Sequence, residues 1–347
     1  MQTTISDTQA QKTAKKRFHS IDFIKGICIL FIIITHYAWS HEERIQFLFP
    51  FWIDMAVPIF MIISGYFYTK SLQKNNTDSL LKGYSPSIVL GKIIRYSVPF
   101  IIAFTLEELL FFLFKVPGTY SLLHLCVTFI CGGVGPGSYY YPVLIQLIFY
   151  FPIIYMIVRK FDFKGFLFCG LLNILYEVLK SVAGMDEALY RLLIFRYTLI
   201  IAYGCYLAMD SYKRHKVLSV LAFGVGVSYI ITCKFFEVEP PFTIYWTGTC
   251  MWACLFIIPI AVPLIFNKAH NSFIELLGRA SYNIFLVQMV YYNVVNMIYP
   301  HIPARALQLV FNIVVCLVAG LVFYFIETPI TNFVHKIVYS LLPEKKA

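Results

Sequence analysis

The feature that most constrains the fold is a series of apolar runs, each about 20 residues long, separated by short polar connections. A run of this length crosses the hydrocarbon core of a bilayer as one helix. Strands of a membrane barrel alternate polar and apolar residues, whereas these runs are apolar on all sides, so helices are the spanning form that fits. We expect ten spans, over residues 21–40, 47–69, 95–114, 139–158, 165–183, 191–209, 216–234, 243–266, 279–299 and 305–326.

Composition supports a membrane protein rather than a soluble domain. Of the 347 residues, 59% are apolar and 13% are charged, and the mean hydropathy is +0.73. Soluble domains carry about 25% charged residues. We therefore expect an all-α polytopic membrane protein in the plasma membrane, with the lipid bilayer as a partner. Because the net charge of +10 gathers at the ends of the spans, no nucleic-acid partner is expected.

The positions of the basic residues predict the orientation of the chain. With the N-terminus in the cytoplasm, most of the 28 Lys and Arg residues fall in cytoplasmic segments, as the positive-inside rule requires. Both termini are then cytoplasmic, and we expect a basic tail over 1–17, a membrane domain over 18–335 and a basic tail over 336–347. The cations placed inside are Lys12, Lys15, Lys16, Arg17, Lys70, Lys74, Lys82, Lys92, Arg95, Arg159, Lys160, Lys164, Lys213, Arg214, Lys216, Lys268, Arg279, Lys336, Lys345 and Lys346.

Two neighbouring stretches do not fit a routine span. The segment SLLHLCVTFICGG (121–133) is apolar but too short, so we expect a re-entrant or interfacial segment on the outer side. GGVGPGS (132–138) has glycines without the spacing of a phosphate-binding loop, and it also falls on the predicted outer side. The nine cysteines lack an accompanying histidine or carboxylate cluster, so we expect packing residues and no metal site.

Ionisable residues in the first predicted span, IDFIKGICILFIIITHYAW (21–39), are candidates for function because charges are costly in hydrocarbon. Lys25 and His36 are eleven residues apart, about three helical turns, and so share one helix face. Asp22 can pair with Lys25 at a spacing of three residues. Lys25 is either a snorkelling cation or functional. His36 is either a hydrogen-bonded structural residue or a proton acceptor, since imidazole titrates near neutral pH.

Six segments, in order along the chain, resemble the motifs of the integral-membrane acyltransferase family 3. The first span is similar to the family's pattern of a basic residue, ten residues and a histidine, and the resemblance runs from about residue 17 to 330. The other five segments are VPIFMIISGYFY (57–68), KIIRYSVPF (92–100), YYYPVLIQLIFYFPIIY (139–155), LLGRASYNIFLVQ (276–288) and VFYFIETPI (322–330).

The resemblance implies an acyltransferase, an enzyme that transfers acyl groups other than aminoacyl groups. Family members usually move acetyl from acetyl-CoA to glycan hydroxyls, so it implies acetyl-CoA as co-substrate, without metal. The acceptor would be a cell-surface or secreted polysaccharide or its lipid-linked precursor. The phosphates of CoA need cations on the cytoplasmic side, and the resemblance assigns this role to Lys25, Lys92 and Arg95. For the two lysines the alternative is that they only follow the positive-inside rule and bind no donor. His36 becomes the general base or a transient acyl carrier.

Further positions bind substrate or serve structure. Ser64 forms a hydrogen bond either with substrate or with the backbone of its own helix, and Gly65 allows the chain to bend. Tyr150 stacks on a sugar or belongs to an aromatic belt with Tyr139–Tyr141, and Glu327 is placed to pair with Lys25, Arg95 or Arg279. Asp22 and Gln288 complete this set. Five buried charges outside the motifs would pair with one another or bind acceptor, namely Glu107, Glu108, Glu177, Lys180 and Arg196.

Two positions depart from the family pattern. Lys25 stands where arginine is usual, which keeps the charge but loses the forked donor. Gln288 stands where histidine is common and cannot take a proton, so a mechanism with two histidines is not expected. Alternatives are a transporter or exporter, a succinyltransferase of the same architecture, and a scaffold that needs no His36. Polysaccharide-assembly proteins or a second copy of the chain stay open as partners.

Overall fold

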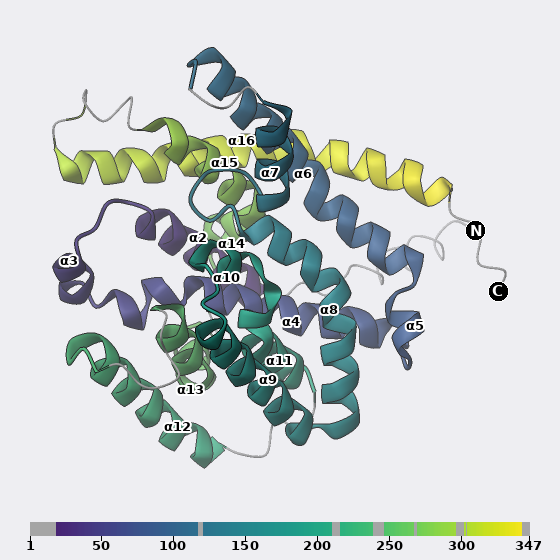
Figure 1. Cartoon of the computed structure of the whole chain (residues 1–347), viewed down its shortest axis with the longest axis vertical. Helices are drawn as coiled ribbons and strands as arrows, with labels where there is room; N and C mark the ends of the chain where they lie inside the picture. The colour runs from purple at the N-terminus through teal and green to yellow at the C-terminus, as the bar shows by residue number, and fades with distance from the viewer. Residues whose placement is uncertain are drawn as a thin grey trace, which may run out of the picture.

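The computed structural model describes residues 19–116, 121–209, 216–238, 246–266, 269–295, 302 and 304–341, and these residues form helices without strands. The helices are α2 (His19–Thr35), α3 (His41–Gln46), η2 (Phe49–Phe51), η3 (Ile53–Met55), α4 (Ala56–Lys74), α5 (Leu80–Gly83), α6 (Pro86–Leu113), α7 (Leu122–Cys131), α8 (Tyr140–Phe161), α9 (Phe163–Val182), α10 (Glu187–Leu192), η4 (Ile194–Tyr197), α11 (Thr198–Leu207), α12 (Lys216–Ile230), η6 (Ile231–Phe235), α13 (Trp246–Phe266), α14 (Ser272–Arg279), α15 (Ser281–Val294) and α16 (Arg305–Ser340). In Figure 1, α16 crosses the upper part of the view, and α12 and α13 lie at the lower edge.

Each of the ten predicted spans overlaps helical structure within the described residues. Within the described part of the chain, five helical segments are long and apolar enough to cross a membrane. The full count of ten spans and the cytoplasmic placement of both termini stay predictions. The five segments are Phe49–Lys74, Leu80–Leu113, Tyr140–Phe161, Phe163–Val182 and Arg305–Ser340.

The helix ends differ from the predicted boundaries in three places. The first helix, α2, ends at Thr35, because the Tyr37 amide and the Trp39 indole both donate to the Ile34 carbonyl (3.1 and 2.7 Å) and close the last turn. The third begins at Pro86 rather than residue 95, since proline suits the first helical turn. The last continues to Ser340, past the expected domain boundary at 335.

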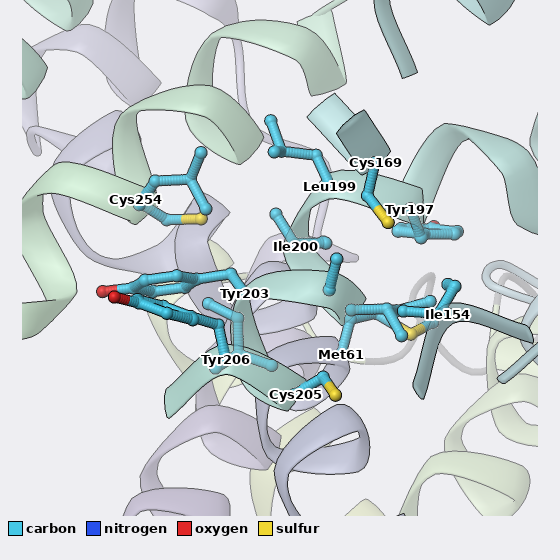
Figure 2. Packing of buried hydrophobic residues seen from close by; sticks show 14 of the residues in the cluster. Met61, Ile154, Cys169, Tyr197, Leu199, Ile200, Tyr203, Cys205, Tyr206 and Cys254 are labelled. Atoms are coloured by element: carbon cyan, nitrogen blue, oxygen red, sulfur yellow. The ribbon is translucent and has the colours of Figure 1, made fainter. Parts of the chain in front are cut away.

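One hydrophobic cluster surrounds α11, in which every residue from Thr198 to Tyr206 is buried. Figure 2 shows Met61 of α4, Ile154 of α8, Cys169 of α9 and Cys254 of α13 converging on this helix. Helices α4 and α11 cross in backbone contact, because two glycines lie at the crossing. A Cβ on Gly65 would clash with the Ile201 carbonyl, and a Cβ on Gly204 with the Ile62 carbonyl. Gly65 therefore permits close packing, and α4 runs through it as one helix.

A second cluster joins α2, α6, α15 and α16. The short helix α14 lies against α2 through another glycine pair, since Gly26 abuts the Ile274 carbonyl and Gly278 abuts the Asp22 carbonyl. In α16, Gly320 similarly abuts Ile284 of α15. These contacts place the start of α2 beside residues more than two hundred positions later in the sequence.

Candidate active site

Side chains of α2, α4, α6, α8, α15 and α16 line one continuous cavity of about 1690 Å³. Of the residues predicted to bind or react, His36, Asp22, Ser64 and Glu327 lie on its wall. The wall also carries a set of cations that includes the three predicted donor residues, namely Lys25, Lys70, Lys74, Lys82, Lys92, Arg95 and Arg279.

His36 lies in the turn that follows α2, one residue beyond the end of the helix. His36 thus lies just past the end of the helix that carries Lys25, and both residues line the cavity. Its Nδ1 is 2.8 Å from Oε1 of Gln288, which is fully buried in α15. The Gln288 amide nitrogen donates in turn to the Pro136 carbonyl (3.4 Å), which orients the amide. Nδ1 thus carries the proton, and the lone pair of the neutral ring is on Nε2.

The glycine-rich turn after α7 forms part of the surroundings of His36, a role that its sequence did not predict. Gly137 has a φ of +86°, which a residue with a side chain rarely adopts. A Cβ there would lie 3.7 Å from His36 Cε1 and 3.0 Å from the Phe285 ring. On another side, the Tyr292 ring meets the imidazole edge to face at 6.0 Å. Histidine, glutamine and turn thus form one packed unit.

The predicted donor residues lie on α2 and α6. Lys25 Nζ is 4.0 Å from Asp22 Oδ1, as expected for a pair three residues apart on one helix. Lys92 Nζ lies 3.5 Å from the centre of the Tyr68 ring, within range of a cation–π contact. Arg95 is exposed on the cavity wall, and among the described residues it forms no hydrogen bond or ion pair. Its guanidinium is therefore available to a ligand.

Three other predicted residues have structural partners. Ser64 donates to the Phe60 carbonyl of its own helix (2.8 Å). Tyr150 lies off the cavity wall, with its hydroxyl 3.1 Å from Thr198 Oγ1. Glu327 accepts hydrogen bonds from Asn283 (2.9 Å) and Thr331. Within the described residues Glu327 forms no ion pair with a cation, so the expected pairing with Lys25, Arg95 or Arg279 is wrong.

The five charged residues outside the motifs have most of their hydrogen bonds with residues outside the group, and within the group Arg196 and Lys180 attract the charge of Glu177. Glu107 accepts from the Asn293 amide (2.5 Å), and Glu108 lies 3.8 Å from His124. The Tyr190 hydroxyl donates to Glu177 (2.6 Å), and Lys180 pairs with Glu187 (3.3 Å). Arg196 is the member of this group that lies on the cavity wall.

A cluster away from the cavity wall joins α2 to α14. His19 Nδ1 is 2.7 Å from one Glu275 oxygen, and His270 Nδ1 contacts the other. The ligand atoms of the three residues lie within 4.8 Å of one another, so this set could hold a metal ion. Hydrogen bonding by His19, and then by His270, holds the pKa of the Glu275 carboxyl below its usual range.

The fold and the cavity define a multi-pass helical membrane protein with a histidine and a set of cations at one site. A family model described as an acyltransferase domain matches residues 18–326. The chain therefore belongs to acyltransferase family 3 and is a membrane acyltransferase. No curated protein and no solved structure gives a significant match.

Proposed function

We propose that the protein transfers an acetyl group from acetyl-CoA to a hydroxyl of a cell-surface or secreted polysaccharide, or of its lipid-linked precursor, at the plasma membrane. The observation that carries this proposal is the single cavity that contains both His36 and the cations. Its volume of about 1690 Å³ exceeds the roughly 300–1,000 Å³ of ordinary small-molecule sites, as a site for two substrates requires.

The cations account for binding of the donor. CoA carries a pyrophosphate and a 3′-phosphate, and charge-assisted hydrogen bonds from Arg and Lys are the usual means of holding them. Arg95 offers a forked guanidinium without a protein partner among the described residues. Lys92 and Lys25 add charge on the neighbouring wall. The thioester arm of the donor then extends along the cavity toward His36.

The reaction follows from the tautomer of His36. Nε2 takes the proton of the acceptor hydroxyl while that oxygen attacks the thioester carbonyl. The tetrahedral intermediate collapses with cleavage of the C–S bond, and the imidazolium returns the proton to the departing CoA sulfur. The products are the acyl ester and free CoA. Gln288 serves this step by fixing the ring orientation and keeping the proton on Nδ1. The same lone pair would serve an acyl-histidine intermediate.

The test is transfer of labelled acetyl from acetyl-CoA by the purified chain in nanodiscs, with and without a crude glycan acceptor. We expect acceptor-dependent CoA release that falls by about 10²–10⁴-fold in His36→Ala, the usual contribution of a general base. His41→Ala is the matched control, because His41 is an exposed histidine nearby in sequence. If the wild type neither binds acetyl-CoA nor releases CoA with any acceptor, the enzyme proposal fails, and transport of the glycan is measured next.

A further inference from the structure

Arg196 is a buried cation that the donor site and the reaction leave unused. It lies in η4, and only 2% of the residue is exposed. It nevertheless lines the cavity that holds His36. Burying a charge in this position costs free energy unless the charge has partners, so the contacts of Arg196 indicate its role.

Aromatic rings surround the Arg196 guanidinium. Its central carbon lies 4.5 Å from the centre of the Tyr197 ring, 4.8 Å from Tyr139 and 5.6 Å from Tyr190. One terminal nitrogen, Nη2, donates to the Tyr197 hydroxyl. Cation–π contacts of this kind stabilise the charge but do not satisfy the N–H donors.

Two donor atoms of Arg196 have no partner. Both Nε and Nη1 are buried without a hydrogen bond among the described residues. Glu177, which does not line the cavity, attracts the Arg196 charge, but it accepts its hydrogen bond from the Tyr190 hydroxyl (2.6 Å) and forms no ion pair with Arg196 in the described structure. Arg196 lines the cavity, and its two unpaired nitrogens lie buried just behind the wall, so a small turn of the guanidinium toward the cavity would offer them to an anionic ligand.

The site adjoins the reacting histidine through the glycine-rich turn. Gly137 packs against the His36 ring, and the ring of Tyr139 lies against Arg196. These two turn residues are two positions apart, so their Cα atoms are separated by at most about 7 Å. Arg196 and His36 also line the same cavity, so one substrate in that cavity could reach both residues.

We propose that Arg196 binds an anionic group, of the carboxylate or phosphate class, on one of the two substrates of the proposed function, on which this inference rests. One source is a second carboxylate on the acyl group of the donor. The other is an acidic group on the acceptor glycan. In either case the guanidinium turns toward the cavity and the anion accepts hydrogen bonds from Nε and Nη1, while the rings of Tyr139 and Tyr197 stabilise its charge.

Binding to the chain in nanodiscs tests this proposal with two matched pairs of ligands. The donor pair is succinyl-CoA against acetyl-CoA, and the acceptor pair is a uronic-acid oligosaccharide against its neutral counterpart. We expect the wild type to prefer the anionic member of one pair, which identifies the source. Arg196→Gln should bind that member at least about tenfold more weakly and its neutral counterpart equally well. Arg196→Lys keeps the charge and should retain part of the preference.

The outcomes separate this inference from the proposed function. A wild type that shows no preference in either pair overturns the inference, and so does a preference that survives in Arg196→Gln. If Arg196→Gln does not fold, Arg196→Lys decides, because an unchanged preference in a variant that lacks the guanidinium donors counts against the site. The protein could also bind the anionic ligand in a manner that depends on Arg196 and yet transfer no acyl group. That result would support the anion site and refute the proposed acyl transfer.

Discussion

At the scale of single residues, His36 depends on a neighbour that does not itself react. Gln288 is buried behind the imidazole and holds it through one hydrogen bond of 2.8 Å. The family pattern commonly has a histidine here. Glutamine cannot take up a proton as histidine can, but its side-chain oxygen still accepts a hydrogen bond from an N–H group. In the proposed reaction, His36 is therefore the proton acceptor at this position, and Gln288 is not.

A substitution that removes this hydrogen bond should lower kcat rather than raise KM. In Gln288→Leu the ring loses its orientation and its defined tautomer, and we expect kcat to fall about 100-fold, the effect of a small misplacement of a reacting group. KM for acetyl-CoA should stay nearly unchanged, because Gln288 does not line the cavity. Steady-state kinetics give both constants. A large rise in KM with normal kcat would contradict a positioning role.

Gly137 is the second residue on which His36 depends. In Gly137→Ala the φ of +86° strains the backbone and the Cβ meets Phe285 at 3.0 Å, so the turn has to shift beside His36. We expect a loss of about 1–3 kcal/mol in unfolding free energy together with reduced activity per folded molecule. Gly184→Ala is the control, because Gly184 also has a positive φ of 59° but nothing within 4 Å. That variant should lose stability and keep activity, as unfolding and turnover assays would show.

At the scale of elements, short-range contacts between helices place the residues that line the cavity. Gly65 and Gly204 bring α4 and α11 into backbone contact, and α4 carries Ser64, Tyr68 and Lys70 on the cavity wall. Gly26 and Gly278 do the same for α2 and α14. Small residues allow such approach between helices in a membrane, where van der Waals contact replaces the hydrophobic effect as the main attraction.

The junction between α2 and α14 should respond to pH. The pKa of Glu275 is lowered in the folded state, so its contribution to stability is complete above the ordinary carboxyl value of about 4.3 and is lost as pH falls through the lowered value. Thermal unfolding from pH 7 down to pH 3 should therefore show a smaller loss of Tm in Glu275→Gln than in the wild type. Glu237→Gln, at an exposed carboxyl, should behave as the wild type does. Equal acid sensitivity in all three proteins would refute the role of Glu275.

At the scale of the whole molecule, the wall of one cavity is built from distant parts of the chain. Cations from α2, α4, α6 and α14 gather on its wall, and the histidine stands at the turn between α2 and α3. Helix α16 adds Glu327 and Tyr324 to the wall, although most of its apolar surface faces outward. A two-substrate reaction needs this kind of shared space.

The cation set predicts a dependence on the phosphates of the donor. In Arg95→Gln we expect KM for acetyl-CoA to rise at least about tenfold, because charge-assisted hydrogen bonds to phosphate are lost. KM for S-acetylpantetheine, which lacks the nucleotide phosphates, should change little. Lys160→Gln is the control, since Lys160 is an exposed cation that does not line the cavity. An equal rise in KM for both donors would mean that Arg95 supports the fold rather than the phosphates.

The sequence by itself determined the helical class, the family and the residues of its motifs. Hydropathy is a local property of about 20 consecutive residues, and each of the ten apolar runs overlaps helical structure in the described part of the chain. Motif spacing is equally local, so His36, Lys25, Lys92 and Arg95 could be named from the sequence.

Only the tertiary structure decided which groups meet. His36 and Gln288 are 252 positions apart, and nothing in the spacing of either motif predicts their hydrogen bond. The glycine-rich turn was expected on the outer side without a site role, yet Gly137 packs against His36. Arg196 was one of five charged residues outside the motifs, and packing placed it on the cavity wall with two of its nitrogens unpaired. Hydropathy and spacing act along the chain, whereas these contacts arise from the packing of helices that lie far apart in it.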